Sequence, residues 1–589
     1  MSDLNLLRYY TRLTPMGVGK EIKTALVDVS EALFTSLRHA RNLLNQMHDL
    51  GWLTWEPKAG RNKRSSLILN IELESLKRQI AAERVLAGKY EKALEILDND
   101  KAEFGRLLQS TSGASMHEGQ LHIQLTYKRS FERLVPHQLQ RSSERYLLRQ
   151  IYCCLVSSDK YGQVEPQLAH HWEYNADTLQ WTFYLRPGLT FHDGASIDAA
   201  AIVSLFTQLS RLPEYQTELS HLSDVSSDQP LKVTFTLSEP DKGFAGLISG
   251  VRYSIQPVSQ LTLNTELNVI GSGPFEVIEH SHEKLHLQAF ERYYACRALT
   301  DTVTIWRLND ASTASSLIET NQLAALGDKE CHHYVAYSVD DGERGEKDAE
   351  HGVRHSQIED GCMFVLFNQN TNTRLSESQR RYLSSALSSE NVYSKMQALD
   401  CVFSCEMASN LLPMWKTALR PHCSEVDLPS TLSIAAYDYT GLKNCAYSIQ
   451  SILKEIGIEA VVNTYSYREL SQRSLSGELQ EEIVITNINL DDNRHASAFG
   501  CLFNNPVLHN AIGSEAGAWL AQSLSLLRST SELSEYLNDL EPIASTLISE
   551  YFLSPLFHHR QTLRFQGVLK DVALTNWGWP DIRNVWSAN

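Results

Sequence analysis

Polar side chains that can read DNA bases recur along the segment Ser36–Leu50. Arg38, Arg41, Asn42 and Asn45 share one side of this segment if it is a helix, because successive helical residues turn by about 100°. Arginine can donate two hydrogen bonds to guanine, and asparagine can exchange two with adenine. The segment therefore predicts a helix that contacts base edges in a groove of DNA.

The other side of the same segment is apolar, as a helix packed on a core requires. Its members are Leu37, Ala40, Leu43, Leu44, Met47 and Leu50. A second helix is expected over about Lys23–Leu33, followed by a short turn at Phe34-Thr35, and Gly51 ends the first helix. Two crossed helices joined by a short turn are typical of a helix-turn-helix.

A basic hairpin is expected directly after this helix. "WLTWEP" and "SSLIL" read as two strands, and the connecting "KAGRNKR" contains Gly60 for a tight turn and presents Arg61, Lys63 and Arg64 at its tip for phosphate contacts. An amphipathic helix alone is usually only a solvated surface, but helix and hairpin together favour a winged helix that binds double-stranded DNA. The candidate DNA-binding residues are Ser36, Arg38, His39, Arg41, Asn42, Asn45, Arg61, Lys63 and Arg64.

Charge is distributed unevenly along the chain. The 589 residues carry a formal net charge of -17, which argues against general binding to nucleic acid or to anionic membranes. Residues 1–70 nevertheless contain ten lysines and arginines against six acidic residues. Positive charge is therefore concentrated where the helix and the hairpin are expected.

The length of the chain indicates roughly three to four domain-sized units. Its N-terminus lacks an apolar core of signal-peptide length, and no window holds about 18 consecutive apolar residues, so we expect a soluble, cytoplasmic protein without a membrane segment. The ten scattered cysteines suit a reducing compartment. Residues 72–113 are charged, helix-favouring and free of proline, which predicts a helical linker.

Strand and helix patterns alternate beyond residue 116. "YLLRQIYCCLV" is a buried apolar run, while "LQWTFYLRPGLTFHDG" predicts a strand with Trp181, Phe183 and Leu185 on one face and a second strand through Phe191. "TLSIAAYDYTGLKNCAYSIQSILKEIGIEAVVNTYSY" reads as strand, helix and strand, and "EEIVITNIN" as a buried strand. This pattern predicts an α/β body.

Two family resemblances add to this prediction. "EPQLAHHWEYNADTLQWTFYLRPGLTFHDGASIDAAAIV" resembles the signature region of family 5 extracellular solute-binding proteins, and "VIGSGPFEV" resembles their Gly-Thr-Gly-Pro-Tyr segment with Ser272 and Phe275 substituted. This similarity extends over roughly Gln120–Trp579 and implies a two-lobed, periplasmic-binding-protein-like (type II) body. "RNLLNQMHDLGWLTWEPKAGRNKRS" is similar to the DNA-binding domain of SgrR-type transcriptional regulators, a family associated with sugar-phosphate stress.

The resemblances imply three domains. These are a winged helix-turn-helix at 1–70, a helical linker at 71–115 and a two-lobed, solute-binding-protein-like sensor at 116–589. The implied function is a ligand-responsive, DNA-binding transcriptional regulator that senses a small solute linked to sugar-phosphate stress or sugar transport. The alternatives are the solute-binding component of an ABC importer and a cytosolic peptide-binding chaperone, and whether the chain forms a homo-oligomer is left open.

The resemblance also implies where the ligand cleft lies. The candidate ligand-binding residues are Tyr152, Ser157, Tyr437, Asp438, Tyr439, Asn487, Asn489 and Asp491. Peptide-binding relatives commonly place an aspartate near a tryptophan to meet the peptide amine, whereas "TNINLDD" has asparagines first and its aspartates displaced. Neutral amides suit the hydroxyl groups of a sugar-like solute as well as a peptide.

Other groups of reactive side chains have simpler interpretations. Cys331-His332-His333, the pair Cys401 and Cys405 at helical spacing, and His558-His559 contain metal-ligand types but lack a second ligand pair at zinc-like spacing. We expect no metal and no cofactor at any of them. No catalytic serine, histidine and aspartate order or phosphate-binding glycine loop is present, so enzymatic activity is not expected.

Overall fold

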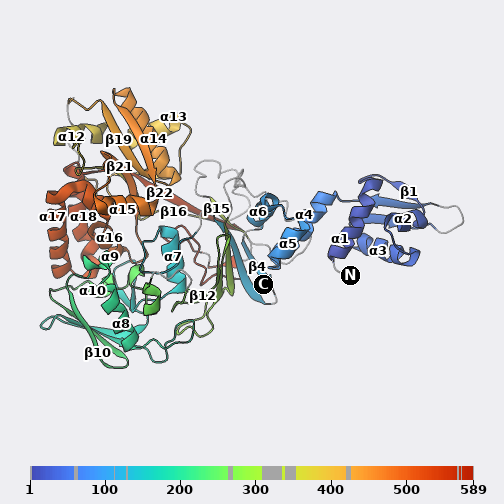
Figure 1. Ribbon diagram of the computed structural model, residues 1–589, viewed down its shortest axis with the longest axis horizontal. Coiled ribbons are helices and arrows are strands. Elements are labelled where there is room, and N and C mark those ends of the chain that lie inside the picture. Colours follow the sequence, from blue (N-terminus) through green and yellow to red (C-terminus); the bar gives the residue numbers. More distant parts are fainter. Residues whose placement is uncertain are drawn as a thin grey trace. The chain divides into compact units, whose positions relative to one another are not determined.

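The structure is a computed structural model of the chain (Figure 1). It describes residues 3–58, 64–111, 113–117, 119–127, 131–262, 269–307, 334–338, 353–419, 426–566, 569–571 and 573–587. The chain forms two compact units. The first consists of Met1–Ser130 and Thr304–Tyr334, and the second of Phe131–Val303 and Val335–Asn589.

The first unit begins with a winged helix. Its elements are α1 (Asp3–Leu13), η1 (Thr14–Met16), β1 (Ile22–Thr24), α2 (Leu26–Ala32), α3 (Leu37–Asp49), β2 (Leu53–Glu56) and β3 (Ser65–Leu69). The strands form an antiparallel sheet in the order β1-β3-β2. Tyr10 of α1 is fully buried, and its hydroxyl donates a hydrogen bond to the backbone oxygen of Ile71 (2.6 Å). This contact fixes α1, which the sequence analysis did not anticipate, to the end of the hairpin.

The two predicted helices are each shorter than expected. The helix predicted over Lys23–Leu33 is α2, which begins only at Leu26, because the residues before it pair with β3 as strand β1. The helix predicted over Ser36–Leu50 is α3, with Ser36 as its N-cap. The predicted apolar stripe is too long by one residue at each end, since Leu37 and Leu50 are about half exposed.

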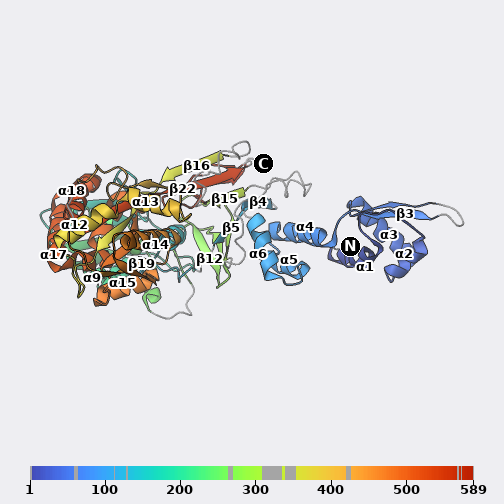
Figure 2. The same cartoon turned by 90° about the horizontal axis from the view of Figure 1, so that it is seen from above.

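Three helices and a hairpin complete the first unit. They are α4 (Leu73–Leu86), α5 (Tyr90–Ile96), α6 (Lys101–Ser110), β4 (Gly113–His117) and β5 (Gln120–Tyr127). Figure 2 shows α4 leading from the winged helix to α5 and α6, and one apolar core runs through all of these helices. The domain limits at residues 70 and 115 stay predictions, and the compact units divide after Ser130 instead.

A tryptophan from a distant part of the sequence completes the core of this unit. Trp306 lies at the end of β14 (Thr302–Arg307), which begins in the second unit and ends in the first. Its ring packs edge-on against Tyr90 of α5 (ring centroids 4.8 Å apart) and Phe104 of α6 (5.7 Å). The Tyr90 side chain is also hydrogen-bonded to Thr304, and burial raises its pKa. Thr304 and Trp306 thus pack with the helical linker.

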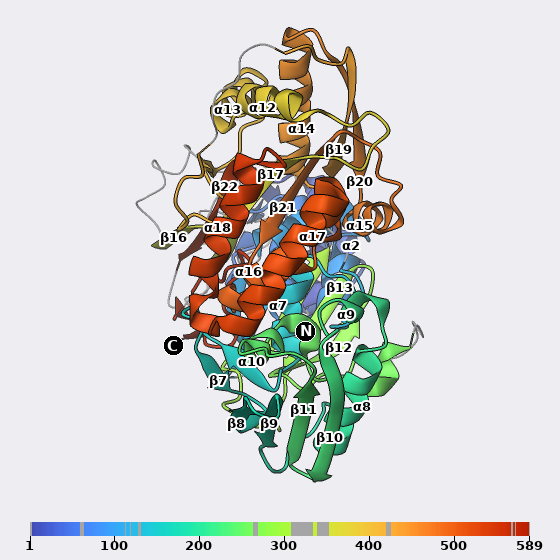
Figure 3. The ribbon, with the colours of Figure 1, turned by 90° about the vertical axis from the view of Figure 1, so that its left-hand side faces the viewer.

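The second unit has two lobes, each with its own apolar core (Figure 3). The first lobe contains α7 (Ser142–Ile151), β6 (Val156–Ser158), β7 (Val164–Pro166), β8 (Ala169–Asn175), β9 (Gln180–Leu185), α8 (Ala199–Leu209), α9 (Pro213–Gln216), β10 (Leu222–Gln229), β11 (Lys232–Leu237), α10 (Phe244–Leu247), β12 (Phe275–His280) and β13 (Lys284–Ala289). One of its sheets has the order β10-β11-β9-β8. The predicted strand with Trp181, Phe183 and Leu185 on one face is β9. The predicted second strand through Phe191 is only an isolated bridge between Thr190 and Ser196.

The second lobe is built around one mixed sheet. Its elements are β15 (Tyr334–Ser338), β16 (Val353–Ile358), β17 (Gly361–Phe367), α12 (Glu377–Ala386), α13 (Ser389–Ala398), β18 (Cys405–Met407), β19 (Thr431–Tyr437), α14 (Thr440–Glu455), β20 (Glu459–Tyr465), α15 (Tyr467–Ser476), β21 (Ile483–Asn489), α16 (Arg494–Phe503), α17 (Pro506–Thr530), α18 (Tyr536–Ser549) and β22 (Leu553–Gln566). The order β22-β17-β21-β19-β20 runs through the sheet. β19 pairs in parallel with both β20 and β21. The predicted α/β architecture is therefore confirmed. The chain then continues into β23 (Leu569–Lys570) and β24 (Trp586–Ser587).

The glycines of "VIGSGPFEV" allow a close approach to the end of α7. The N–H groups of Ser272 and Gly273 both donate to the backbone oxygen of Ile151, at 3.1 and 2.8 Å. A Cβ on Gly271 would lie 2.0 Å from that oxygen, and one on Gly273 would lie 2.6 Å from the Ile151 carbonyl carbon. Only glycine fits at both positions, because any side chain would push the two backbones apart.

His192, which directly follows Phe191, is part of the same contact. Its Nδ1 accepts a hydrogen bond from the Gly271 N–H (3.2 Å), and its Nε2 donates to the Gly273 carbonyl (3.0 Å). Both contacts require the neutral ring, since a second proton would face the Gly271 N–H. Burial lowers the pKa of His192 to about 4, which favours the same neutral form.

We expect the second unit to lose stability in acid partly through His192. Its pKa lies near the ordinary value of 6.5 in the unfolded chain and near 4 in the folded protein, so the unfolded state binds more protons between these values. Stability from this group is present above about pH 6.5 and is lost as the pH falls toward 4. Urea unfolding of the wild type and of His192→Gln at several pH values measures it. An equal slope for both proteins over that interval would contradict the expectation.

We expect Trp306→Ala to loosen the helical linker without unfolding the second unit. Removing a fully buried tryptophan typically costs about 3–5 kcal/mol, and Trp306 is partly buried against this core, so we expect a loss below that range. Hydrogen exchange in α5 and α6 should accelerate accordingly. Trp586→Ala is the matched control, because that tryptophan is 38% exposed and lies outside this core. Unchanged protection of α5 and α6 in Trp306→Ala would show that the linker helices are stable without the tryptophan.

Candidate functional sites

The exposed face of α3 carries the residues predicted to read DNA. Arg38, Arg41, Asn42 and Asn45 are all exposed. The opposite face is fully buried in the core through Ala40, Leu43, Leu44 and Met47. One face of the helix is therefore packed in the core, and the other carries long polar side chains that point to solvent. A helix that lies in a groove of DNA requires this arrangement.

The start of α3 is fixed by a capping hydrogen bond. The hydroxyl oxygen of Ser36 accepts from the N–H of His39 (3.3 Å), and the His39 ring packs edge-on against Tyr9 of α1 (5.8 Å). Ser36 and His39 therefore orient the helix in this structure. On the hairpin, Arg64 is exposed directly before β3, while Arg61 and Lys63 lie outside the described residues.

An arginine that the sequence analysis did not select supports the turn before α3. Arg12 of α1 donates a hydrogen bond to the backbone oxygen of Leu33 (2.8 Å), and its guanidinium lies over the rings of Tyr9 and Phe34 (5.2 and 5.5 Å). Phe34 has a positive φ of 52° and is 82% exposed. Arg12 thus stabilises a turn that few non-glycine residues adopt.

The second unit contains a small polar cavity between its lobes, which we call the solute cavity. It has a volume of about 50 Å³ and is lined by Arg141, Ser142, Arg145, Tyr437, Tyr467, Asn487 and Asn489. The first three residues belong to the start of α7 in the first lobe. The other four lie at the end of β19, the start of α15 and the end of β21 in the second lobe. A ligand in this cavity would therefore contact both lobes.

Arg145 connects the two lobes beside this cavity. Its Nε donates to Oδ1 of Asp491 (2.7 Å), and its Nη2 donates to the backbone oxygen of Asn489 (2.8 Å). The same Asp491 oxygen accepts from Nε1 of Trp577 (2.9 Å). Burial alone would lower the pKa of Arg145, but the facing Asp491 carboxylate raises it, so the arginine is charged at all ordinary pH values.

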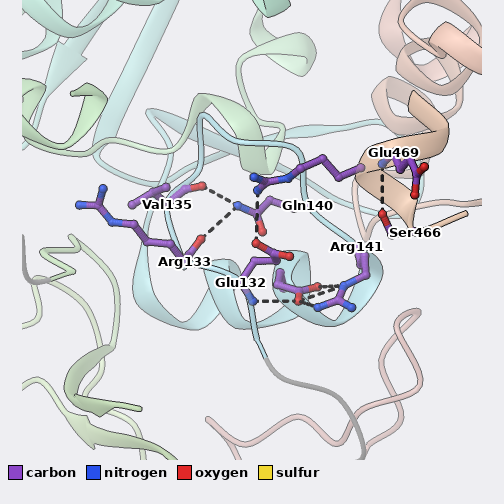
Figure 4. Close-up of polar contacts among 9 residues, drawn as sticks. Glu132, Arg133, Val135, Gln140, Arg141, Ser466 and Glu469 are labelled. Carbon is purple, nitrogen blue, oxygen red and sulfur yellow. Dashed lines mark hydrogen bonds and ion pairs between the residues drawn. The ribbon is translucent and has the colours of Figure 1, made fainter. Parts of the chain in front are cut away.

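The segment that leads into α7 is fixed by its own polar contacts (Figure 4). The Gln140 amide donates to the backbone oxygens of Val135 (2.7 Å) and Arg133 (3.4 Å). Glu132 forms an ion pair with Arg468 of α15 (3.2 Å), which is a second connection between the lobes. Because both of its side chains are about half exposed, this pair contributes at most about 1 kcal/mol.

Arg141, at the cavity, is paired with a buried carboxylate. Its Nε lies 3.1 Å from both carboxylate oxygens of Glu144, whose side chain is fully buried. The charge of Arg141 is thus offset within the first lobe. Arg145 is offset by Asp491 across the lobes, so the cavity wall is polar without a large net charge.

Three of the predicted ligand-binding residues line the solute cavity: Tyr437, Asn487 and Asn489. Asp491 is not among the lining residues, and its carboxylate accepts the hydrogen bond from Arg145. Tyr439 stacks against Tyr437 (ring centroids 6.5 Å apart).

The other predicted ligand-binding residues lie elsewhere. Asp438 is exposed and pairs with Lys443 (2.7 Å), while Ser157 lies in β6. Tyr152 is a core residue, contrary to the prediction. It is 1% exposed, and its hydroxyl donates to the backbone oxygen of Leu134 (3.0 Å).

Sequence reasoning missed the other four residues of the cavity wall, which are Arg141, Ser142, Arg145 and Tyr467. A weak signal existed for three of them. "RSSER" directly precedes the apolar run of α7, and serine with glutamate near such a start is typical of a helix N-terminus. The two arginines are four residues apart and therefore share one helix face.

The predicted absence of a metal concerns three groups of residues. Cys331-His332-His333 lies outside the described residues. Cys401 and Cys405 do not share a helix, because Cys405 begins strand β18, and burial raises its pKa to about 12. In β22, Nδ1 of His558 bonds to the Gly361 backbone oxygen (2.6 Å), and His559 pairs with Glu359 (3.3 Å). Within the part of the chain that the structure describes, no cluster of potential ligands could hold a metal ion.

Comparisons with known proteins identify both units. The family model "Sugar transport-related sRNA regulator N-term" matches residues 5–119, and "Bacterial extracellular solute-binding proteins, family 5 Middle" matches residues 163–379. The HTH-type transcriptional regulators SgrR of Photorhabdus laumondii and Shigella dysenteriae are each 28% identical to the chain, covering 100% of it and 99% of their own lengths.

Solved structures show the same fold for the body. NikA from Brucella suis in complex with Fe(III)-EDTA superimposes with a TM-score of 0.61 at 16% identity, covering 79% of this chain and 99% of NikA. The oligopeptide-binding protein AppA from Bacillus subtilis, in complex with a nonapeptide, gives a TM-score of 0.62 at 16% identity, covering 79% and 98%. None of the described helices is long and apolar enough to cross a membrane.

The fold and these matches define a winged-helix protein fused to a family 5 solute-binding body. The chain is similar over its whole length to the SgrR-type transcriptional regulators.

Proposed function

We propose that this chain is a cytoplasmic transcriptional regulator that binds operator DNA through its winged helix and senses a small solute through its two-lobed body. The observation that carries the proposal is the division of α3 into a buried face and an exposed face with two arginines and two asparagines. Relatives along the whole chain are HTH-type transcriptional regulators named SgrR, which supports this reading. No catalytic step is part of the proposal.

In this proposal α3 contacts the base edges and the hairpin contacts the phosphates. Arg38, Arg41, Asn42 and Asn45 offer the donors and acceptors that pair with base edges in the major groove. Arg64, with Arg61 and Lys63, would neutralise phosphates beside it. The acidic remainder of the chain repels DNA, which confines binding to this end.

The solute acts through the two lobes. A ligand that contacts both lobes stabilises their closed arrangement only by the difference between its affinities for the closed and open forms. The chain passes between the two units three times, after Ser130, Val303 and Tyr334. A change in the body therefore reaches the helical linker through several segments, among them the one that carries Trp306.

The alternative is a solute-binding component of an ABC importer. Such a protein needs the body but has no use for a DNA-reading helix. Operator-specific binding by the purified chain would exclude that role, and binding of solute alone would favour it.

We expect Arg38→Ala and Asn42→Ala to relax sequence discrimination. Each should lose about 1–3 kcal/mol of preference at one or two base pairs, because each removes hydrogen bonds to a base edge. Competition binding with a library of operator variants measures this preference. Arg106→Ala is the control, since it removes an exposed arginine from α6. If both α3 variants retain the site preference of the wild type, the bases are read elsewhere.

We expect solute and operator to change each other's affinity by the same factor. Thermodynamic linkage requires this reciprocity for any two ligands that bias one equilibrium, typically by about 1–3 kcal/mol. Titrating the full-length protein with operator, with and without solute, and then with solute, with and without operator, gives both factors. A solute that binds the body while operator affinity stays constant would overturn the sensor role and leave the body as a scaffold.

A further inference from the structure

The turn between α2 and α3 has an unusual residue at its centre. The N–H of Phe34 donates to the backbone oxygen of Glu31 (3.0 Å), and the N–H of Thr35 donates to that of Ser30 (3.0 Å). These two hydrogen bonds, with a φ of 52° at Phe34, form a Schellman motif that ends α2. Glycine normally occupies the left-handed position of this motif, because a side chain is disfavoured there.

The ends of other helices show what is unusual about Phe34. Gly51 after α3, Gly88 after α4 and Gly457 after α14 have φ values of 74°, 66° and 86°. Tyr551 after α18 is aromatic and has a φ of 56°, but it is only 2% exposed, so packing in the core offsets its strain. Phe34 is 82% exposed and gains no such packing. Strained residues of this kind cluster at functional sites, so the ring is expected to contact another molecule.

Arg12 lies beside this ring and carries a charge that no described carboxylate offsets. Its Nη1 donates to the backbone oxygen of Leu33 (2.8 Å), and its guanidinium carbon lies 5.5 Å from the centre of the Phe34 ring. The arginine is exposed and forms no ion pair with any residue that the structure describes. Its Nε and Nη2 therefore keep donors for an outside acceptor. The two side chains present a cation and an apolar ring next to each other.

This pair adjoins the N-terminal end of α3. Phe34 precedes Ser36, the N-cap of α3, by two residues. Tyr9 connects the pair to the helix, since its ring contacts both the Arg12 guanidinium (5.2 Å) and the His39 ring (5.8 Å). Helix-turn-helix proteins contact base edges with the N-terminal residues of their second helix, so residues just before that helix lie beside the DNA backbone.

We infer that Arg12 and Phe34 form a contact to the DNA backbone beside α3, in which Arg12 pairs with a phosphate and the Phe34 ring packs on the adjoining deoxyribose. The DNA backbone alternates an anionic phosphate with a sugar, which matches a cation beside an apolar ring. Positive charge is concentrated in residues 1–70, so this surface suits DNA better than a protein partner. The inference rests on the proposed DNA-binding function and adds two residues to it.

Phe34→Gly separates the contact from the fold. Glycine adopts the left-handed turn without strain, so the variant should unfold at a urea concentration close to or above that of the wild type. It should nevertheless bind DNA about three- to tenfold more weakly, because the apolar contact is lost. Phe34→Asn should behave in the same way, since asparagine also tolerates this conformation.

Binding is measured with the full-length protein and two DNA probes. One is a duplex that the wild type selects from a random-sequence library, and the other is a shuffled duplex of the same base composition. A backbone contact carries no sequence information, so Phe34→Gly should weaken binding of both duplexes by the same factor. Leu419→Gly is the control, because it removes an equally exposed apolar side chain (82%) from the second unit and should change neither affinity.

Arg12→Ala tests the phosphate contact through the salt dependence of binding. Loss of one phosphate contact should reduce the slope of log affinity against log salt concentration by about one unit. The same reduction is expected in the Phe34→Gly background, where the turn no longer needs the arginine for support. If Arg12 only stabilises the turn, Arg12→Ala will leave the slope unchanged and will have no effect in that background. This result would overturn the phosphate contact.

The outcomes distinguish this inference from the proposed function. If the wild type prefers the selected duplex but Phe34→Gly and Arg12→Ala bind it with wild-type affinity and salt slope, the backbone contact fails and the proposed function stands. If the wild type binds both duplexes alike, operator reading fails, while weaker binding by the two variants supports the backbone contact. Wild-type DNA affinity of Phe34→Gly with a lost transcriptional response in a reporter strain would overturn the inference and assign the ring to a protein partner.

Discussion

The ion pair between Arg145 and Asp491 is the contact on which the solute cavity depends. It joins residues 346 positions apart and brings the start of α7 against the end of β21. Asp491 is also held by Trp577, so the C-terminal segment helps to position the arginine. Removing one partner of such a partly buried pair leaves a charge without compensation, which is far more costly than the pair is favourable. The pair therefore connects the two lobes beside the cavity.

The N-terminal end and the body of the chain differ in the sign of their net charge. The basic N-terminal end can approach the phosphates of DNA, while the acidic body resists nonspecific contact with them. Within the body, charged side chains form local ion pairs, as Arg141 does with Glu144.

The candidate sites were predictable to different extents. The exposed polar face of α3, the candidate for reading DNA, follows from local spacing alone, because a helix period decides which side chains share a face. Tyr437, Asn487 and Asn489 followed from resemblance to binding proteins of the same fold. Tyr152 did not, because an aromatic residue at the end of an apolar run suits a core as well as a cleft, and only packing against Leu134 decides between them. The arginines of α7 were missed because nothing near them in sequence indicates what they face.

The sequence by itself determined the elements and their order: an amphipathic helix before a basic hairpin, a charged helical linker and an α/β body. These depend on local preferences and on periodicity, which neighbouring residues specify. The tertiary structure alone decided that Ile22–Thr24 is a strand, since its partner is β3, and that Trp306 belongs to the core of the linker helices. It also decided that Arg145 meets Asp491. Each of these contacts joins residues far apart in the chain, and their energy depends on a geometry that exists only once the intervening segments have folded.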